Sequence, residues 1–169
     1  KKYTNISLIC TVSAGFDNLD IQHAEKLGIS VMNVAGANST SAAEFTWALI
    51  LAITKRLHKA DSMMKSGVFN YSGFSNTELK GKTIGIIGVG NIGSKVARIA
   101  KAFGMKILGN DIKPALKKKY PYVKFVTLNK LLTYSDVFTI HTPLYDSTKH
   151  LINRNNIRLI KKHQVMIKI

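Results

Sequence analysis

The amino-acid sequence predicts an α/β protein built around a doubly wound parallel sheet. From residue 83 onward, short apolar strand patterns alternate with helical patterns to the end of the chain. Strands that alternate with helices pair in parallel, because each helix returns the chain to the same end of the sheet. A separate strand, helix and strand at the N-terminus precede one long helical stretch. These observations indicate two α/β regions joined by a helix.

The composition is that of an ordinary globular protein. The chain has 169 residues, which is enough for one core or slightly more. Its 46% hydrophobic and 20% charged residues exclude a disordered or fibrous chain. The longest mostly apolar stretch, residues 42–53, is shorter than the roughly 20 residues that a membrane-spanning helix needs. We therefore expect a folded protein that makes no membrane contact.

The N-terminal region has the pattern of one strand, one helix and a second strand. Residues 6–12 form a short apolar strand, and residues 20–27 form a helix that ends at Gly28, a residue suited to the left-handed C-cap position. Residues 29–33 are the second strand. Cys10 is the only cysteine and has apolar neighbours, so we expect a buried structural thiol in a protein of the reducing cytoplasm.

A long helix is predicted to follow. Ser41 and Glu44 have the spacing of a capping box, and apolar residues recur at helical intervals as far as Met64. Gly67 is the expected stop. A helix of about 25 residues is long beside the usual mean of about 11 to 12. We interpret it as a connector between two domains.

The second region supplies the main sheet. After an irregular loop over residues 67–82, the pattern predicts strands at 83–87, 106–109, 123–126, 137–140 and 165–167. Helices are predicted at 92–103, 128–134 and 155–161, with a basic loop before the third strand. This order is typical of a Rossmann-type sheet.

A glycine motif follows the first of these strands. Gly88, Gly90 and Gly93 form G-x-G-x-x-G between the apolar strand and a helix with one buried stripe. The first glycine permits the tight turn, the second lets the backbone approach a pyrophosphate, and the third lets the helix pack on the strand. Backbone amides at the helix N-terminus can then bind the pyrophosphate. In this context a turn without a ligand is the weaker alternative.

An acidic residue follows the next strand. Asp111 lies 18 residues beyond Gly93, where a carboxylate can accept hydrogen bonds from a ribose diol and repel a 2′-phosphate. Its position favours NAD over NADP, although a solvent-facing or helix-capping role remains the alternative. A contact to the 2′-phosphate of NADP remains an alternative, because Lys113 and the lysine run at 117–119 follow closely.

Four motifs, in order along the chain, carry a family resemblance. They are SAGFDNLD at 13–20, GANSTSAAE at 36–44, TELKGKTIGIIGVGNIG at 77–93, and HTPL at 141–144 followed by Thr148 and LIN at 151–153. Together they resemble the D-isomer-specific 2-hydroxyacid dehydrogenases, and especially the phosphoglycerate dehydrogenases among them. The motifs cover essentially the whole chain, which makes them far more specific than the glycine motif alone.

The resemblance implies a domain organisation. Residues 1–35 would be the last strand–helix–strand unit of a flavodoxin-like substrate domain, and residues 36–169 an incomplete NAD-binding Rossmann domain. Residues 41–66 would be the interdomain helix and would help to form a homodimer.

The resemblance also implies site residues. The cofactor NAD would contact Ala14, Gly88, Gly90, Asn91, Ile92, Gly93, Asp111, Thr142 and Pro143. The carboxylate of a small 2-hydroxy or 2-keto acid would be held at Ser13, Ala14, Gly15 and Asn38. From the residues alone, Ser13 to Gly15 fit an ordinary turn as well as an anion-binding nest, and Asn38 fits a turn.

The implied reaction is hydride transfer between NAD and a D-2-hydroxy acid such as 3-phosphoglycerate. The family's arginine and its histidine–glutamate pair would follow the strand at 165–167, beyond the printed sequence. We therefore assign no catalytic residue and no metal ligand, and expect these residues alone to be inactive. The histidines present do not replace the acid–base pair and are interpreted as structural or exposed; they are His23, His58, His141, His150 and His163.

Two other functions compete with this one. A non-catalytic NAD-binding sensor or corepressor-like module would carry the same motifs. The net charge of +16 allows a nucleic-acid binder. The basic residues are mostly scattered lysines, however, and the only run is at 117–119. A solvated surface is the favoured interpretation, and nucleic acid is not an expected partner.

Overall fold

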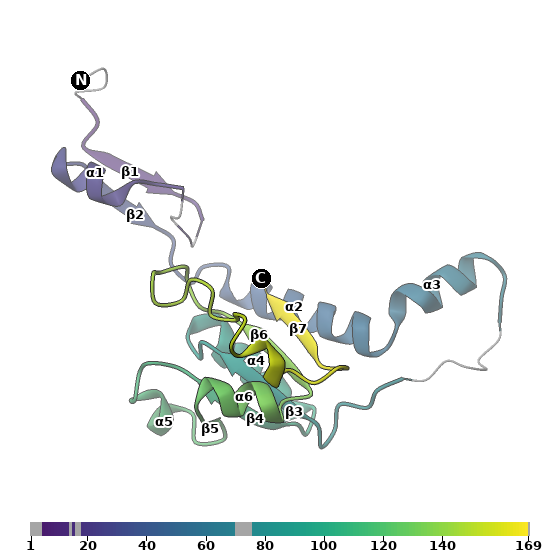
Figure 1. Cartoon of the computed structure of the whole chain (residues 1–169). Coiled ribbons are helices and arrows are strands. Elements are labelled where there is room, and N and C mark those ends of the chain that lie inside the picture. The colour runs from purple at the N-terminus through teal and green to yellow at the C-terminus, as the bar shows by residue number, and fades with distance from the viewer. Residues whose placement is uncertain (1–4, 14, 16–17, 70–75, 169) are drawn as a thin grey trace.

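The described part of the chain contains two parallel sheets with their connecting helices (Figure 1). The computed structural model describes residues 5–13, 15, 18–69 and 76–168. A two-stranded sheet has the order β1-β2, and a five-stranded sheet has the order β5-β4-β3-β6-β7. Every strand pair in both sheets is parallel. The α/β fold with a doubly wound parallel sheet is confirmed.

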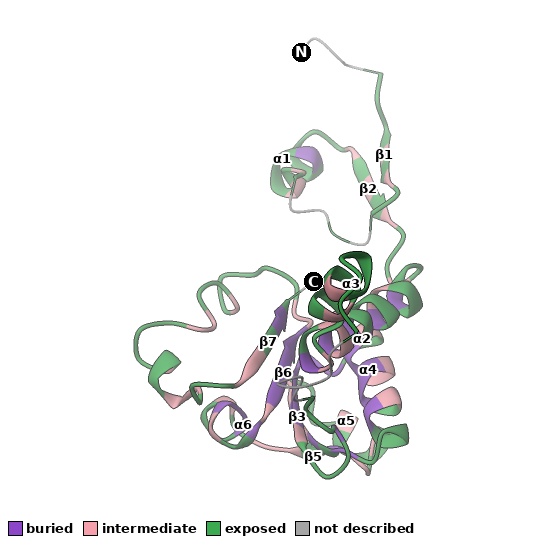
Figure 2. Ribbon diagram, turned by 90° about the vertical axis from the view of Figure 1, so that its right-hand side faces the viewer, coloured by how far each residue is buried: buried purple, intermediate pink, exposed green. Residues whose placement is uncertain are grey.

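The N-terminal unit comprises β1 (Leu8–Thr11), α1 (Ile21–Lys26) and β2 (Ser30–Asn33). The Asp20 carboxylate caps α1 by accepting a 2.9 Å hydrogen bond from the His23 amide. At the other end of α1, Gly28 adopts a φ of +71°, the left-handed conformation that glycine allows without strain. This unit stands apart from the larger sheet in both views (Figures 1 and 2).

The side chain of Cys10 is exposed, which corrects the expectation of a buried thiol. Helix α1 covers one face of the two-stranded sheet. On the opposite face Cys10 lies with Leu8 and Met32, which are 46% and 59% exposed. A two-stranded sheet with one helix buries only one of its faces, so apolar neighbours in the sequence do not by themselves bury the thiol.

The long helix is divided into α2 (Ser39–Thr54) and α3 (Leu57–Lys65), which corrects the expectation of one continuous helix. Between them Arg56 adopts a left-handed φ of 51°. The Thr54 carbonyl accepts a hydrogen bond from the Thr77 amide at 3.1 Å, and the Lys55 ammonium donates to the Thr77 carbonyl at 2.8 Å. These long-range bonds replace helical ones and end α2.

The start of α2 also differs from the prediction. The helix begins at Ser39 after the N-cap residue Asn38, so Ser41 lies inside the helix and cannot form a capping box with Glu44. No side chain caps this end. Within the first turns of the helix, the Thr46 hydroxyl donates to the Ala42 carbonyl one turn earlier, at 2.8 Å.

The larger sheet follows the predicted order of elements. Its strands are β3 (Thr83–Ile87), β4 (Lys106–Asn110), β5 (Lys124–Phe125), β6 (Val137–Ile140) and β7 (Val165–Lys168). The connecting helices are α4 (Asn91–Ala102), α5 (Leu116–Lys119) and α6 (Leu128–Tyr134). The expected loop before β5 thus contains the short helix α5.

The helix predicted at 155–161 is wrong. Only a 3₁₀ turn, η1 (Ile157–Leu159), is present. The Asn156 side-chain oxygen accepts from the Asn153 amide at 2.9 Å, and the Asn153 oxygen accepts from the Asn155 amide at 2.9 Å. Such local side-chain bonds compete with the hydrogen bonds of a helix.

The core lies on both faces of the larger sheet. Helices α2 and α4 cover one face, where Ile84, Ile86 and Val96 are fully buried, and α6 covers the other. The Trp47 indole donates to the Val96 carbonyl at 3.2 Å, which ties α2 to α4. Figure 2 shows the buried residues gathered between these layers. Helix α2 is therefore part of the second region's core.

The described residues contain no helix that is both long and apolar enough to cross a lipid bilayer. Nor do any three or more His, Cys, Asp or Glu side chains gather, within those residues, into a possible metal site.

Candidate functional site

The glycine loop joins the end of β3 to the start of α4. Gly88 has a φ of +86°, and a Cβ placed on it would lie 2.7 Å from the His141 carbonyl oxygen. Its amide donates to the Asn110 carbonyl at the end of β4 at 2.8 Å. The loop therefore lies directly between the ends of β4 and β6, and only glycine fits at its first position.

Gly93 allows α4 to pack directly on the loop. A Cβ at this position would collide with the Gly88 carbonyl oxygen and would lie 3.0 Å from the Ile86 side chain. The helix axis can approach the strand this closely only without a side chain here. The N-terminus of α4 is thereby held at the carboxyl end of the sheet.

Gly90 is in a different environment. It is the N-cap residue of α4, no side chain caps that helix, and a Cβ on it would meet nothing within 4 Å. The first amides of a helix have no partner within the helix and carry the positive end of its dipole. Such amides, with open space beside Gly90, fit the pyrophosphate of a dinucleotide.

Asp111 lies at the carboxyl end of β4 and is tied to the loop. Its Oδ2 accepts a hydrogen bond from the Val89 amide at 2.7 Å, and its Oδ1 accepts one from the Lys113 amide at 2.9 Å. The side chain is half-buried. A carboxylate has about four acceptor positions, so capacity remains for the hydroxyls of a ribose.

Thr142 and Pro143 follow β6, the strand on the other side of β3. The Thr142 methyl would lie 3.0 Å from a Cβ on Gly88, so this segment adjoins the glycine loop. The Pro143 carbonyl accepts a 2.6 Å hydrogen bond from the Thr148 hydroxyl, which closes the turn after β6. The structure brings these residues, the glycine loop and Asp111 to one edge of the sheet.

His141 precedes this turn and has an unusual environment. Among the described residues neither ring nitrogen has a hydrogen-bond partner, although both are buried. Burial lowers the pKa of His141 from 6.5 to about 4, because desolvation disfavours the charged imidazolium. The ring is therefore neutral at physiological pH, and no partner orients it as a proton acceptor.

The proposed substrate-binding residues belong to the N-terminal unit and to the linker, which comprises residues 34–38 between β2 and α2. The Ser13 hydroxyl donates to the Gly15 carbonyl at 2.6 Å. The hydroxyl groups of Thr11 and Ser13 also form a hydrogen bond, at 2.7 Å. Ala14 lies outside the described residues. Asn38 is the N-cap residue of α2, and its side chain makes no capping bond.

A contact that the sequence alone does not reveal joins the linker to the start of α4, directly after the glycine loop. Gly36 has a φ of +83°, and a Cβ on it would lie 2.7 Å from Nδ2 of Asn91, the first residue of α4. The sequence offered one sign of a close contact here, because the second family motif begins with this glycine. Its partner could not be identified, because 55 residues separate the two positions.

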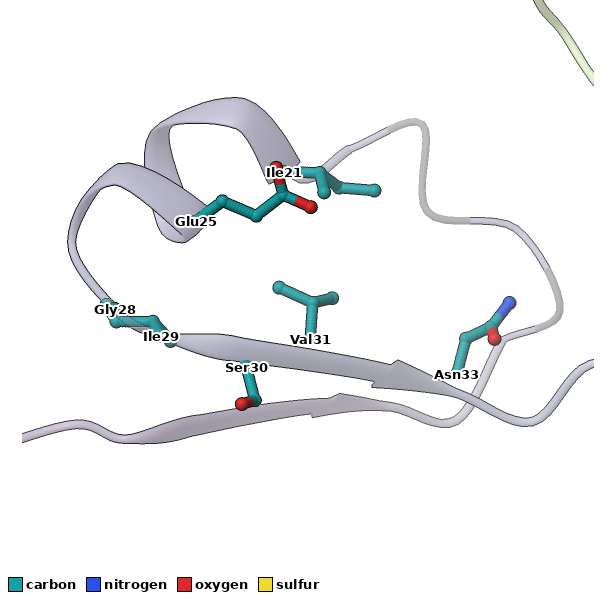
Figure 3. A pocket seen from close by; sticks show the side chains of 7 residues that line it. All are labelled: Ile21, Glu25, Gly28, Ile29, Ser30, Val31 and Asn33. Atoms are coloured by element: carbon teal, nitrogen blue, oxygen red, sulfur yellow. The ribbon is translucent and has the colours of Figure 1, made fainter.

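A hollow of about 520 Å³ lies in the N-terminal unit (Figure 3). It is formed between α1 and β2, and the side chains of Glu25 and Val31 point toward it. None of the described residues that we expect to bind cofactor or substrate lines this hollow. The described residues that we expect to bind the cofactor lie instead at the carboxyl ends of the strands of the larger sheet.

The parallel sheet, the glycine loop and the acid after β4 together define a dinucleotide-binding domain. Residues 47–169 match the family model of the D-isomer specific 2-hydroxyacid dehydrogenase, NAD binding domain. The chain therefore belongs to the D-isomer specific 2-hydroxyacid dehydrogenase family, as the sequence motifs predicted, and the matching domain is the one that binds NAD.

Curated relatives and solved structures agree. The chain is 39% identical to a hydroxypyruvate reductase of Thermotoga maritima, covering 96% of this chain and 53% of that protein. It is 37% identical to a D-3-phosphoglycerate dehydrogenase of Methanocaldococcus jannaschii, covering 99% and 32%. The crystal structure of D-lactate dehydrogenase from Aquifex aeolicus complexed with NAD and lactic acid has a TM-score of 0.88 and 38% identity, covering 96% and 49%. The chain thus spans about half the length, or less, of these relatives.

Proposed function

We propose that this chain is the NAD-binding part of an oxidoreductase that transfers hydride between a D-2-hydroxy acid and NAD. The observation that carries the proposal is the open, uncapped N-terminus of α4 behind Gly90, with Asp111 held beside it by the Val89 amide. Family membership supports the same cofactor. NAD would supply the hydride acceptor, and the chain's own residues would bind and orient it.

Each part of the edge has a distinct role in this proposal. The amides of Asn91 and Ile92 bind the pyrophosphate, since these residues begin α4 and no side chain caps that helix. Asp111 accepts hydrogen bonds from the adenosine ribose and repels a 2′-phosphate, which selects NAD over NADP. Thr142 and Pro143 contact the far side of the dinucleotide, because they adjoin Gly88 at the next strand end.

The proposed substrate is a small 2-hydroxy or 2-keto acid, with 3-phosphoglycerate as the specific candidate. The relatives include proteins named as hydroxypyruvate, glyoxylate and phosphoglycerate enzymes, so the family match leaves the acid open. The resemblance of residues 77–93 to phosphoglycerate dehydrogenases favours 3-phosphoglycerate. Ser13, Ala14, Gly15 and Asn38 are proposed to hold the substrate carboxylate.

We also propose the domain boundaries and the assembly. Residues 1–35 would end a substrate domain, residues 36–169 would form the NAD-binding domain, and the helical stretch 41–66 would join them. Helices α2 and α3 expose the apolar side chains Phe45, Ile53 and Leu57, which are 47–56% exposed. A homodimer through this surface would bury them. The proposed compartment is the cytoplasm.

Calorimetric titration of the chain with NAD and NADP tests the cofactor proposal. We expect NAD to bind and NADP to bind at least about tenfold more weakly, because Asp111 repels the extra phosphate. Tighter binding of NADP would overturn the assigned role of Asp111. Absence of binding by either nucleotide in a folded sample would overturn the cofactor site itself.

A further inference from the structure

A second hollow lies at the opposite end of the larger sheet from the glycine loop. It has a volume of about 550 Å³ and lies where β3, β4 and β5 begin, beside α6. Thr83 and Lys106, which line it, are the first residues of β3 and β4. Four residues of parallel strand span roughly 13 Å, so the hollow is separate from the cofactor edge that follows Ile87.

Three lysines from three elements surround this hollow, which we name the lysine hollow. Lys106 begins β4, Lys124 begins β5, and Lys130 lies in α6. All three side chains are exposed, and none of the described residues that line the hollow is acidic. Among the described residues, ion pairs form at Lys65–Asp61 and Lys161–Asp136, and none of the three lysines takes part in one.

The neighbouring acid is already engaged. Asp136 precedes β6, and its Oδ2 accepts a hydrogen bond from the Thr83 amide at 2.8 Å. Its Oδ1 faces the Lys161 ammonium at 3.7 Å. Over residues 101–134 the chain carries eight lysines and one acid, Asp111, which lies at the other end of the sheet. The described residues that line the lysine hollow therefore carry a net positive charge.

The lining of the lysine hollow is not uniformly polar. Leu108 and Val126 are half-buried apolar residues on the face of the sheet that α6 covers. Tyr122 and Tyr134 add aromatic rings with hydroxyl groups. The Tyr122 ring is held by the Lys101 ammonium, 5.0 Å from its centroid. An apolar surface with cations and hydroxyls beside it suits a ligand that has both an apolar body and an anionic group.

We propose that the lysine hollow binds a small organic phosphate ester with an apolar or aromatic body. Lysine ammonium groups bind phosphate as point charges, and three of them are enough to balance the two negative charges of a phosphate ester. The apolar body would pack on Leu108 and Val126, and the tyrosine hydroxyls would donate to ester or phosphate oxygens. Neither the hydride transfer nor NAD binding uses this site.

The first test is an amide proton–nitrogen NMR titration of the chain with phenyl phosphate. We expect shifts concentrated at residues 106–108 and 124–126, with binding weakened by added salt. Inorganic phosphate and phenol, each carrying half of the ligand chemistry, should bind at least about tenfold more weakly. Shifts spread evenly over the lysine-bearing surface would overturn the proposal, as would equal binding of inorganic phosphate.

Matched variants complete the test. The triple change Lys106→Gln, Lys124→Gln and Lys130→Gln should weaken phenyl phosphate at least about tenfold. The control triple Lys26→Gln, Lys149→Gln and Lys162→Gln removes the same charge from exposed positions elsewhere and should change affinity less than about twofold. Equal loss in both triples would show general charge attraction and overturn the site. NAD shifts at residues 89–92 report separately on the proposed cofactor function.

Discussion

The Val89 amide donates a 2.7 Å hydrogen bond to Oδ2 of Asp111, so the glycine loop and the acid after β4 form one unit. The loop cannot change conformation without losing a charge-assisted hydrogen bond, and the carboxylate cannot turn away without leaving a loop amide unpaired. In the proposed cofactor site, this hydrogen bond would couple pyrophosphate binding to ribose recognition.

The change Asp111→Asn should weaken NAD binding and reduce discrimination against NADP. The amide oxygen can still accept from Val89, so the loop keeps its shape, but the negative charge is lost. Loss of a charge-assisted hydrogen bond to the ribose corresponds to about tenfold to a hundredfold weaker NAD binding. Calorimetry with both nucleotides measures it, and Asp146→Asn, at an exposed acid, is the control. An unchanged NAD to NADP ratio would contradict the prediction.

The change Gly93→Ala should destabilise the fold. The added methyl collides with the Gly88 carbonyl, which is backbone and cannot move away cheaply. Overpacking of this kind costs about 1–3 kcal/mol of unfolding free energy, or roughly 2–9 °C in Tm for a chain of this size. Thermal unfolding followed by circular dichroism measures the shift. A Tm equal to that of the unchanged protein would refute the close packing of α4 on the loop.

The change Gly90→Ala should separate binding from stability. A Cβ at Gly90 meets nothing within 4 Å, so the Tm should fall by less than about 2 °C. The methyl would fill part of the open space beside the N-terminus of α4, where we propose that the pyrophosphate binds, and NAD binding should weaken at least about tenfold. The same thermal and calorimetric measurements apply. Undiminished NAD binding would place the pyrophosphate elsewhere.

Stability should fall as the pH drops from about 6.5 to about 4, in part because of His141. Its pKa is lowered from 6.5 to about 4 in the folded chain, so the unfolded chain binds the proton more readily in that window. The contribution of the neutral ring is complete above pH 6.5 and is lost on acidification, by about 2 kcal/mol at pH 5.

Urea unfolding at pH 7.5 and pH 5 checks this expectation. His141→Gln should lose the His141 share of the pH dependence, whereas the control His163→Gln, at an exposed histidine, should keep it. If both variants retain the full difference between the two pH values, His141 is not the group that titrates.

The changes Phe45→Glu and Ile53→Glu should dissociate the proposed homodimer. Both side chains are about half exposed on α2, and burying a carboxylate in an apolar interface without a partner is costly. Sedimentation velocity should report a monomer for the double variant and a dimer for the unchanged chain. Leu144→Glu, at another exposed apolar side chain outside these helices, should leave the dimer intact. A monomeric unchanged chain would disprove this interface.

Local patterns in the sequence predicted where most residues of the proposed cofactor site lie in the fold. Gly88, Gly90 and Gly93 specify a strand-to-helix turn through spacing alone, and Asp111 follows the next apolar strand. Their positions depend on contacts between consecutive elements, which periodicity reveals. The family motifs added Thr142 and Pro143, and strand pairing brings these beside the loop.

The sequence by itself determined the alternation of strands and helices, the parallel sheet and the glycine loop, because these follow from hydrophobic period and backbone freedom. Only the tertiary structure decided where the long helix breaks, since Thr77 competes for the Thr54 carbonyl from 23 residues away. It also decided the exposure of Cys10, the approach of Gly36 to Asn91, and the convergence of three lysines on one hollow. These features depend on which distant segments meet, and no local pattern encodes that.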